Sequence, residues 1–126
     1  MAKITIPIIV PSVNETNKLH WGARDRLKRS YVARIRGAIS DMRNEKGEQL
    51  GITKMKKPKK RRVMIYSFRK KIMDRDNIWA SHKQLIDALK ELGLIWDDSE
   101  KYIDLRVFQL EHPEQKTEIF IEDSNK

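Results

Sequence analysis

Apolar residues along the first half of the chain follow strand and helix periodicities in turn. Residues 3–10 (KITIPIIV) are rich in β-branched side chains and predict a strand, which Pro7 places at a sheet edge or a bulge. From Ala23 to Arg43 the apolar positions predict an amphipathic helix with a basic outer face; they are Leu27, Tyr31, Ile35, Ala38 and Met42. Residues 63–68 (VMIYSF) predict a second strand.

The second half continues the same alternation of strands and helices. Residues 77–92 predict a helix that ends at Gly93, a residue suited to a left-handed C-terminal cap. Residues 102–110 and 117–121 predict two strands, separated by a loop of hairpin-compatible length at 112–116. The order β-α-β-α-β-β predicts an α+β fold, with one mixed four-stranded sheet and two main helices on one face. A single domain is expected over residues 1–122, followed by a frayed tail at 123–126.

The net charge and the absence of cysteine indicate which kinds of partner and site this chain can have. The chain has 27 Lys and Arg against 18 Asp and Glu, a net charge of +9, which points to nucleic acid as a polyanionic partner. An excess of surface lysine is the simpler alternative. The absence of cysteine excludes disulfides, zinc-thiolate sites and a cysteine nucleophile. No apolar stretch approaches the ~20 residues of a membrane span and no secretory signal is visible, so a cytoplasmic protein is the default expectation.

Two basic clusters flank the second predicted strand. Seven of the nine residues at 54–62 (KMKKPKKRR) are basic, and residues 69–71 (RKK) follow the strand. They are expected either to line a nucleic-acid path or to form a solvated loop. The predicted nucleic-acid-binding residues are Lys56, Lys57, Lys59, Lys60, Arg61, Arg62, Arg69, Lys70 and Lys71.

Asp74 and Asp76 lie one residue apart at the junction between the second strand and the second long helix. If the extended conformation persists there, both side chains project from the same face. Two adjacent carboxylates repel each other unless a cation neutralises them, and Mg²⁺ prefers such hard oxygen ligands. The alternative is that Asp76 caps exposed N–H groups at the start of the helix.

Lys83 and Asp98 complete the candidate chemistry. Lys83 falls within about 20° of Asp76 around the predicted helix, where its ammonium group could stabilise a phosphate. Alternatively, it forms a surface pair with Asp87, four residues later. Asp98, in a composition common in turns, could reach the same metal only if the chain folds back or if a dimer interface brings it there.

Three sequence blocks resemble the RusA family of Holliday-junction resolvases. They are residues 74–77 (DRDN), 83–89 (KQLIDAL) and 93–99 (GLIWDDS), with weaker support from residues 11–14 (PSVN). The resemblance implies a homodimeric nuclease, of bacterial or phage type, that binds four-way DNA junctions. With Mg²⁺, or Mn²⁺ as an alternative, such an enzyme makes paired nicks in opposing strands.

Position by position, the resemblance makes Asp74, Asp76 and Asp98 metal-binding aspartates and Lys83 the catalytic lysine. Better-known family members place that lysine where this chain has Ala80, so the match requires a three-residue insertion at 80–82. Two other functions stay open. One is a non-catalytic basic nucleic-acid-binding protein, and the other is a nuclease selective for forks, flaps or other branched DNA.

Overall fold

The computed structural model describes residues 2–11, 21–40, 55–73 and 81–124. Within these ranges lie four strands and two helices, in the predicted order β-α-β-α-β-β. The strands are β1 (Ala2–Ile6), β2 (Arg61–Arg69), β3 (Ile103–Glu111) and β4 (Lys116–Asp123). The helices are α2 (Trp21–Ser40) and α4 (Lys83–Glu91). The predicted α+β class is therefore confirmed.

The strands form one mixed sheet in the order β1-β4-β2-β3. β4 is antiparallel to both of its neighbours, β1 and β2, whereas β2 and β3 are parallel. The loop between β3 and β4 has the length of a hairpin connection but does not form a hairpin, because β2 lies between the two strands. At the end of β2 the backbone N–H of His112 donates to the carbonyl oxygen of Arg69 over 2.7 Å.

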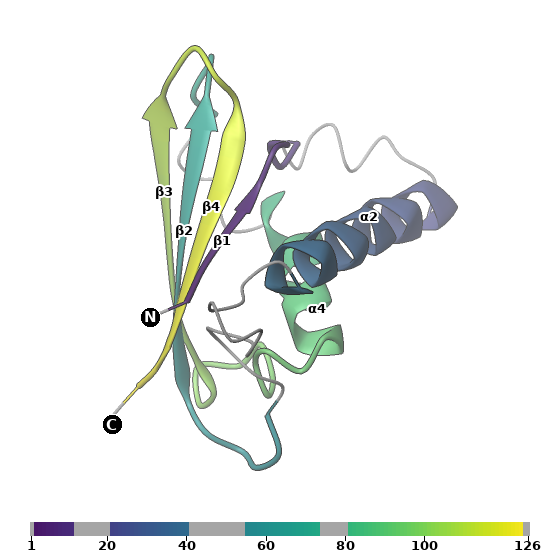
Figure 1. Ribbon diagram of the computed structural model, residues 1–126, viewed down its shortest axis with the longest axis vertical. Coiled ribbons are helices and arrows are strands. Elements are labelled where there is room, and N and C mark those ends of the chain that lie inside the picture. The colour runs from purple at the N-terminus through teal and green to yellow at the C-terminus, as the bar shows by residue number, and fades with distance from the viewer. Residues whose placement is uncertain (1, 12–20, 41–54, 74–80, 125–126) are drawn as a thin grey trace.

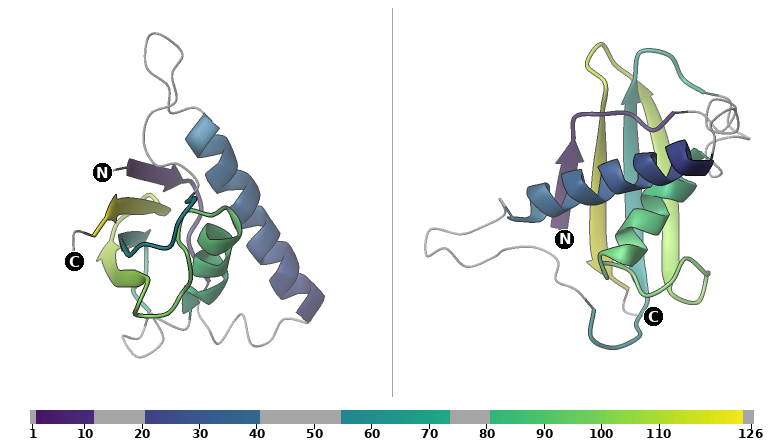
Figure 2. Two further views of the ribbon diagram at one scale, coloured as in Figure 1. Left: turned by 90° about the horizontal axis from the view of Figure 1, so that it is seen from below. Right: turned by 90° about the vertical axis from the view of Figure 1, so that its right-hand side faces the viewer.

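Both helices cover the same face of the sheet (Figures 1 and 2). Alternate residues of β1, β2 and β4 point toward the helices, as strand periodicity requires, and are almost fully buried. The largest members of this core are Ile4, Ile6, Ile65, Ile119 and Ile121 from the sheet and Tyr31, Ile35, Leu85 and Leu89 from the helices. Each aliphatic side chain contributes ~1.5–3 kcal/mol by leaving water, so the apolar spacing seen in the sequence accounts for this packing.

Several boundaries differ from the predicted ones. β1 ends at Ile6, before Pro7, and occupies a sheet edge as proline requires. β2 begins at Arg61, inside the basic run that we expected to remain outside the sheet. β4 continues through Asp123, and the N–H of Ser124 donates to the Lys60 carbonyl, so the predicted tail is ordered at its first two residues. The predicted helix start at residue 77 lies outside the described residues.

Among the residues that the structure describes, neither helix, α2 or α4, is long and apolar enough to cross a membrane.

Candidate active site

The loop that follows α4 folds back against the helix. Gly93 adopts φ 74°, as expected for a glycine that ends a helix in the left-handed region. The N–H of Leu94 donates to the Leu89 carbonyl over 3.0 Å, and the side chains of Leu94 and Ile95 enter the core. Asp97 then forms an ion pair of 2.9 Å with Lys90 of α4. The loop thereby reverses the direction of the chain within a single subunit.

The sheet anchors the same loop from its other side. The guanidinium of Arg61, on β2, donates to the carbonyl oxygen of Leu94 over 2.7 Å, and the Arg61 N–H donates to the Tyr102 carbonyl over 3.1 Å. The carbonyl of Ser99 accepts from the N–H groups of Tyr102 and Ile103. Asp98 therefore lies between two segments whose backbone groups are hydrogen-bonded to the rest of the fold.

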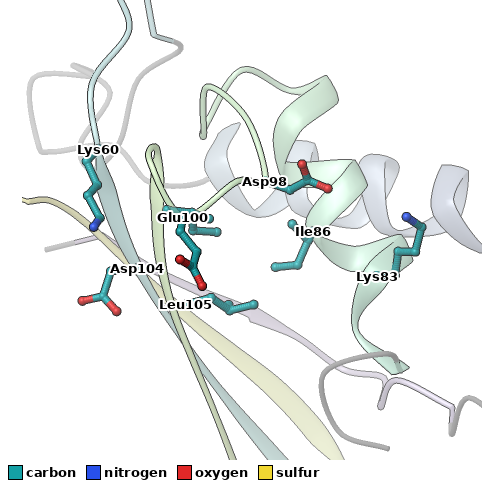
Figure 3. Close-up of a pocket in the computed structure, with 8 residues that line it drawn as sticks. Lys60, Lys83, Ile86, Asp98, Glu100, Asp104 and Leu105 are labelled. Atoms are coloured by element: carbon teal, nitrogen blue, oxygen red, sulfur yellow. The ribbon is translucent and has the colours of Figure 1, made fainter.

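A pocket of about 600 Å³ opens between α4, this loop and the start of the edge strand β3. Figure 3 shows its lining: Lys83 and Ile86 come from α4, Asp98 and Glu100 from the loop, and Lys60 from the segment before β2. The first residues of β3, at positions 103–105, complete the wall. The pocket thus combines two lysines with several carboxylates on an apolar floor.

Four of the charged groups that line this pocket form no ion pair with any residue that the structure describes. Across the described ranges, no ion pair within 4 Å involves Lys60, Lys83, Asp98 or Glu100. Asp104 differs, because Arg62 donates to it over 3.1 Å and this hydrogen bond lowers the pKa of the Asp104 carboxyl. Four charged groups are therefore available to a ligand without first breaking an internal ion pair.

The structure brings together two of the four predicted site residues. Lys83 and Asp98, fifteen positions apart, line one pocket because the loop folds back. Asp74 and Asp76 lie outside the described residues. Among the residues that are described, no group of three acidic or histidine side chains could hold a metal ion. Asp98 supplies a hard carboxylate ligand of the kind Mg²⁺ prefers, and the described pocket alone does not complete a metal site.

A contact that no sequence pattern indicated fixes the chain at Met73, just before Asp74. The side-chain amide of Gln109, on β3, donates to the Met73 carbonyl over 2.7 Å and accepts from the Met73 N–H over 3.0 Å. Both backbone groups of Met73 are thus held by one side chain. Glu100 and Asp104 were also missed as pocket residues, although their closeness in sequence to Asp98 could have indicated them.

The nine predicted nucleic-acid-binding residues divide into three groups: two are buried, two more pair with carboxylates, and five are neither buried nor paired with a described residue. Arg61 and Arg69 are 3% and 5% exposed, so their burial does not fit the expected contact with DNA. Lys59 pairs with Asp123, and Arg62 pairs with both Asp104 and Glu122. The remaining five are free of ion pairs within the described chain, and all but the half-buried Lys60 are exposed; they are Lys56, Lys57, Lys60, Lys70 and Lys71.

Comparison of the chain with protein-family models and with curated proteins finds no match to either. The family resemblance therefore depends on the sequence blocks alone.

Proposed function

We propose that this protein is a magnesium-dependent endodeoxyribonuclease that cuts branched DNA, with the four-way junction as its first expected substrate. The observation that carries the proposal is the shared pocket of Lys83 and Asp98, two residues that the sequence alone singles out. Neither group forms an ion pair inside the described chain, as suits groups that bind a phosphate and a cation.

Each pocket residue has a role that follows from its chemistry. Asp98 would hold Mg²⁺ together with Asp74 and Asp76, whose assignment comes from the sequence. When bound, the metal would activate a water molecule and stabilise charge on the scissile phosphate. Lys83 would bind a phosphate oxygen as a point charge, and Lys60 would hold the DNA backbone at the opposite side of the pocket (Figure 3). The exposed lysines at 56–57 and 70–71 would extend the basic path.

The decisive experiment compares Asp98→Asn with its neighbour Asp97→Asn on a labelled four-way junction. The native protein should nick the junction with Mg²⁺ and not with EDTA. Asp98→Asn should nick at least ~100-fold more slowly, as expected when a group that stabilises the transition state is lost, while still binding the junction. Asp97→Asn should keep most of the activity, because Asp97 faces Lys90 and does not line the pocket.

Three outcomes distinguish the alternatives. Junction binding without cutting in any divalent metal would favour a non-catalytic nucleic-acid-binding protein. Faster cutting of forks, flaps or RNA–DNA hybrids than of the four-way junction would keep the nuclease and change its substrate. If Asp98→Asn nicks the junction at the native rate, Asp98 takes no part in cutting and the pocket is not the active site.

A further inference from the structure

The pocket beside α4 contains a carboxylate that the proposed mechanism does not use. Glu100 lines the pocket, is exposed, and forms no ion pair with any residue in the described ranges. Asp104, the other acidic residue on this side of the pocket, is instead paired with Arg62 at 3.1 Å and with Arg106 at 3.6 Å. Glu100 is therefore a hydrogen-bond acceptor that is still available to a donor from a ligand.

The negative charge of Glu100 limits which part of a DNA strand it can bind. A carboxylate repels the phosphate groups, and the described part of the chain holds no group of three acidic or histidine side chains that would bind a metal ion between them. Within a DNA strand, hydrogen-bond donors are found on the bases, as amino and ring N–H groups. Glu100 therefore fits a base better than it fits the backbone.

The pocket also has an apolar floor, formed by Ile86, Ile103 and Leu105. In Figure 3, Ile86, Leu105 and Glu100 lie between the two lysines of the pocket. A sugar-phosphate backbone has little apolar area to place on such a floor, whereas the flat face of a base can pack against aliphatic side chains. The volume of about 600 Å³ falls within the ~300–1,000 Å³ of pockets that enclose small molecules.

We propose that this pocket takes one nucleotide unstacked from the DNA, with its base on the apolar floor and a base N–H group donating to Glu100. This inference rests on the proposed function and adds that the substrate presents an unpaired nucleotide near the bond that is cut. In a duplex the base is bonded to its partner and stacked on both faces, so it cannot reach the floor or Glu100. Lys60 and Lys83 would bind the phosphates on either side of that nucleotide.

Glu100 then makes the pocket selective among the bases. Adenine, cytosine and guanine each carry an exocyclic amino group that can donate to a carboxylate. Thymine has no amino group, and the two carbonyl oxygens beside its single N–H group repel a carboxylate. Glu100 is thus a specificity-determining residue, and thymine should be the base that the pocket binds least well.

The first measurement is the fluorescence of 2-aminopurine placed as a single unpaired nucleotide at the branch point of a four-way junction, in EDTA. Stacking on neighbouring bases quenches this fluorophore, and the described lining of the pocket has no aromatic ring that would quench it again. Saturating native protein should raise the fluorescence several-fold, because the base leaves the stack. A 2-aminopurine paired within an arm of the junction should change little. Since EDTA prevents cutting, the readout does not depend on nuclease activity.

The second measurement compares the dissociation constants, in EDTA, of four junctions that differ only in the unpaired base. The native protein should bind the thymine junction at least ~10-fold more weakly than the best of the other three. Glu100→Gln should bring this difference below about threefold, because an amide both donates and accepts and so suits thymine as well. Glu114→Gln is the matched control, since Glu114 is exposed and does not line the pocket, and it should keep the native preference. Circular dichroism checks that both variants are folded.

An unchanged 2-aminopurine signal on saturating binding overturns the proposal, as does native protein that binds the four junctions equally. A folded Glu100→Gln that keeps the native preference against thymine overturns it too. If this variant loses Mg²⁺-dependent nicking without any change in base preference, Glu100 acts on the metal and not on a base. The nuclease proposal fails on a different result, the absence of nicking in any divalent metal, so the two failures are distinguishable.

Discussion

The pocket beside α4 and the face of the sheet opposite the helices both carry acidic and basic side chains, but they arrange them differently. On the face opposite the helices Arg62 bridges two carboxylates, and Lys3 pairs with Glu118. In the pocket Lys83 and Asp98 have no such partner within the described chain. Unpaired charges in a concave site can bind a charged ligand directly. Charges that are already paired with each other are less available to a ligand, so an apolar surface surrounded by them can bind a partner mainly through its shape and its apolar area. The distribution of ion pairs thus distinguishes the candidate active site from the opposite face of the sheet.

The largest effect expected from this difference is on the rate of cutting. Lys83→Met should slow junction nicking by roughly 100- to 1,000-fold, because it removes a positive charge from the reacting phosphate. Lys90→Met is the control, since Lys90 lies on the same helix but pairs with Asp97 at 2.9 Å. It should change the rate by less than about threefold, since its charge lies outside the pocket. If Lys83→Met and Lys90→Met lower the single-turnover rate equally, the unpaired lysine of the pocket has no special role in cutting.

Much of the fold could be predicted because it depends on local patterns. The apolar run at 63–68 that predicts a strand lies within β2, and every second residue of this strand is buried. The helical spacing before Gly93 matches the buried side of α4, and the glycine adopts the positive φ that its position indicates. These features follow from the periodicity of strands and helices and from the freedom of glycine, and both can be read from neighbouring residues.

What the sequence could not predict depends on long-range contacts. The length of the loop predicted at 112–116 was compatible with a hairpin, but β2 separates the two strands that it joins. Arg61 belonged to a basic run, yet it is buried because its guanidinium bonds Leu94 and Asp123. The Gln109 contact to Met73 has no local signal at all. The meeting of Lys83 with Asp98 required a fold-back that spacing left undecided.

A smaller effect is expected on the salt dependence of DNA binding. The double variant Lys56→Gln/Lys57→Gln removes two exposed lysines that lack ion pairs in the described chain. If both contact phosphates, the slope of log affinity against log salt should fall by about 1.8, at ~0.9 per contact. Arg62→Gln/Arg106→Gln removes two cations already paired with carboxylates and should change the slope much less. Fluorescence anisotropy with a labelled junction measures both slopes, and equal changes would contradict the separation of paired from unpaired charges.

The smallest expected effect is on the pH dependence of stability, and it tests the exposed ion pair between the loop and α4. The hydrogen bond from Lys90 lowers the pKa of Asp97 below its usual value of 3.8, with a further contribution from the Asp98 N–H. Because the folded-state pKa is the lower one, this stabilisation is present above pH 4 and is lost as the pH falls through the folded-state value. Asp97→Asn keeps an acceptor for the Asp98 N–H but loses the charge. The variant should therefore unfold at a slightly lower temperature than the native protein at pH 7, and the two should converge under strongly acidic conditions. A difference in melting temperature that persists unchanged at pH 2 would mean that the charge of Asp97 is not the source of this stabilisation.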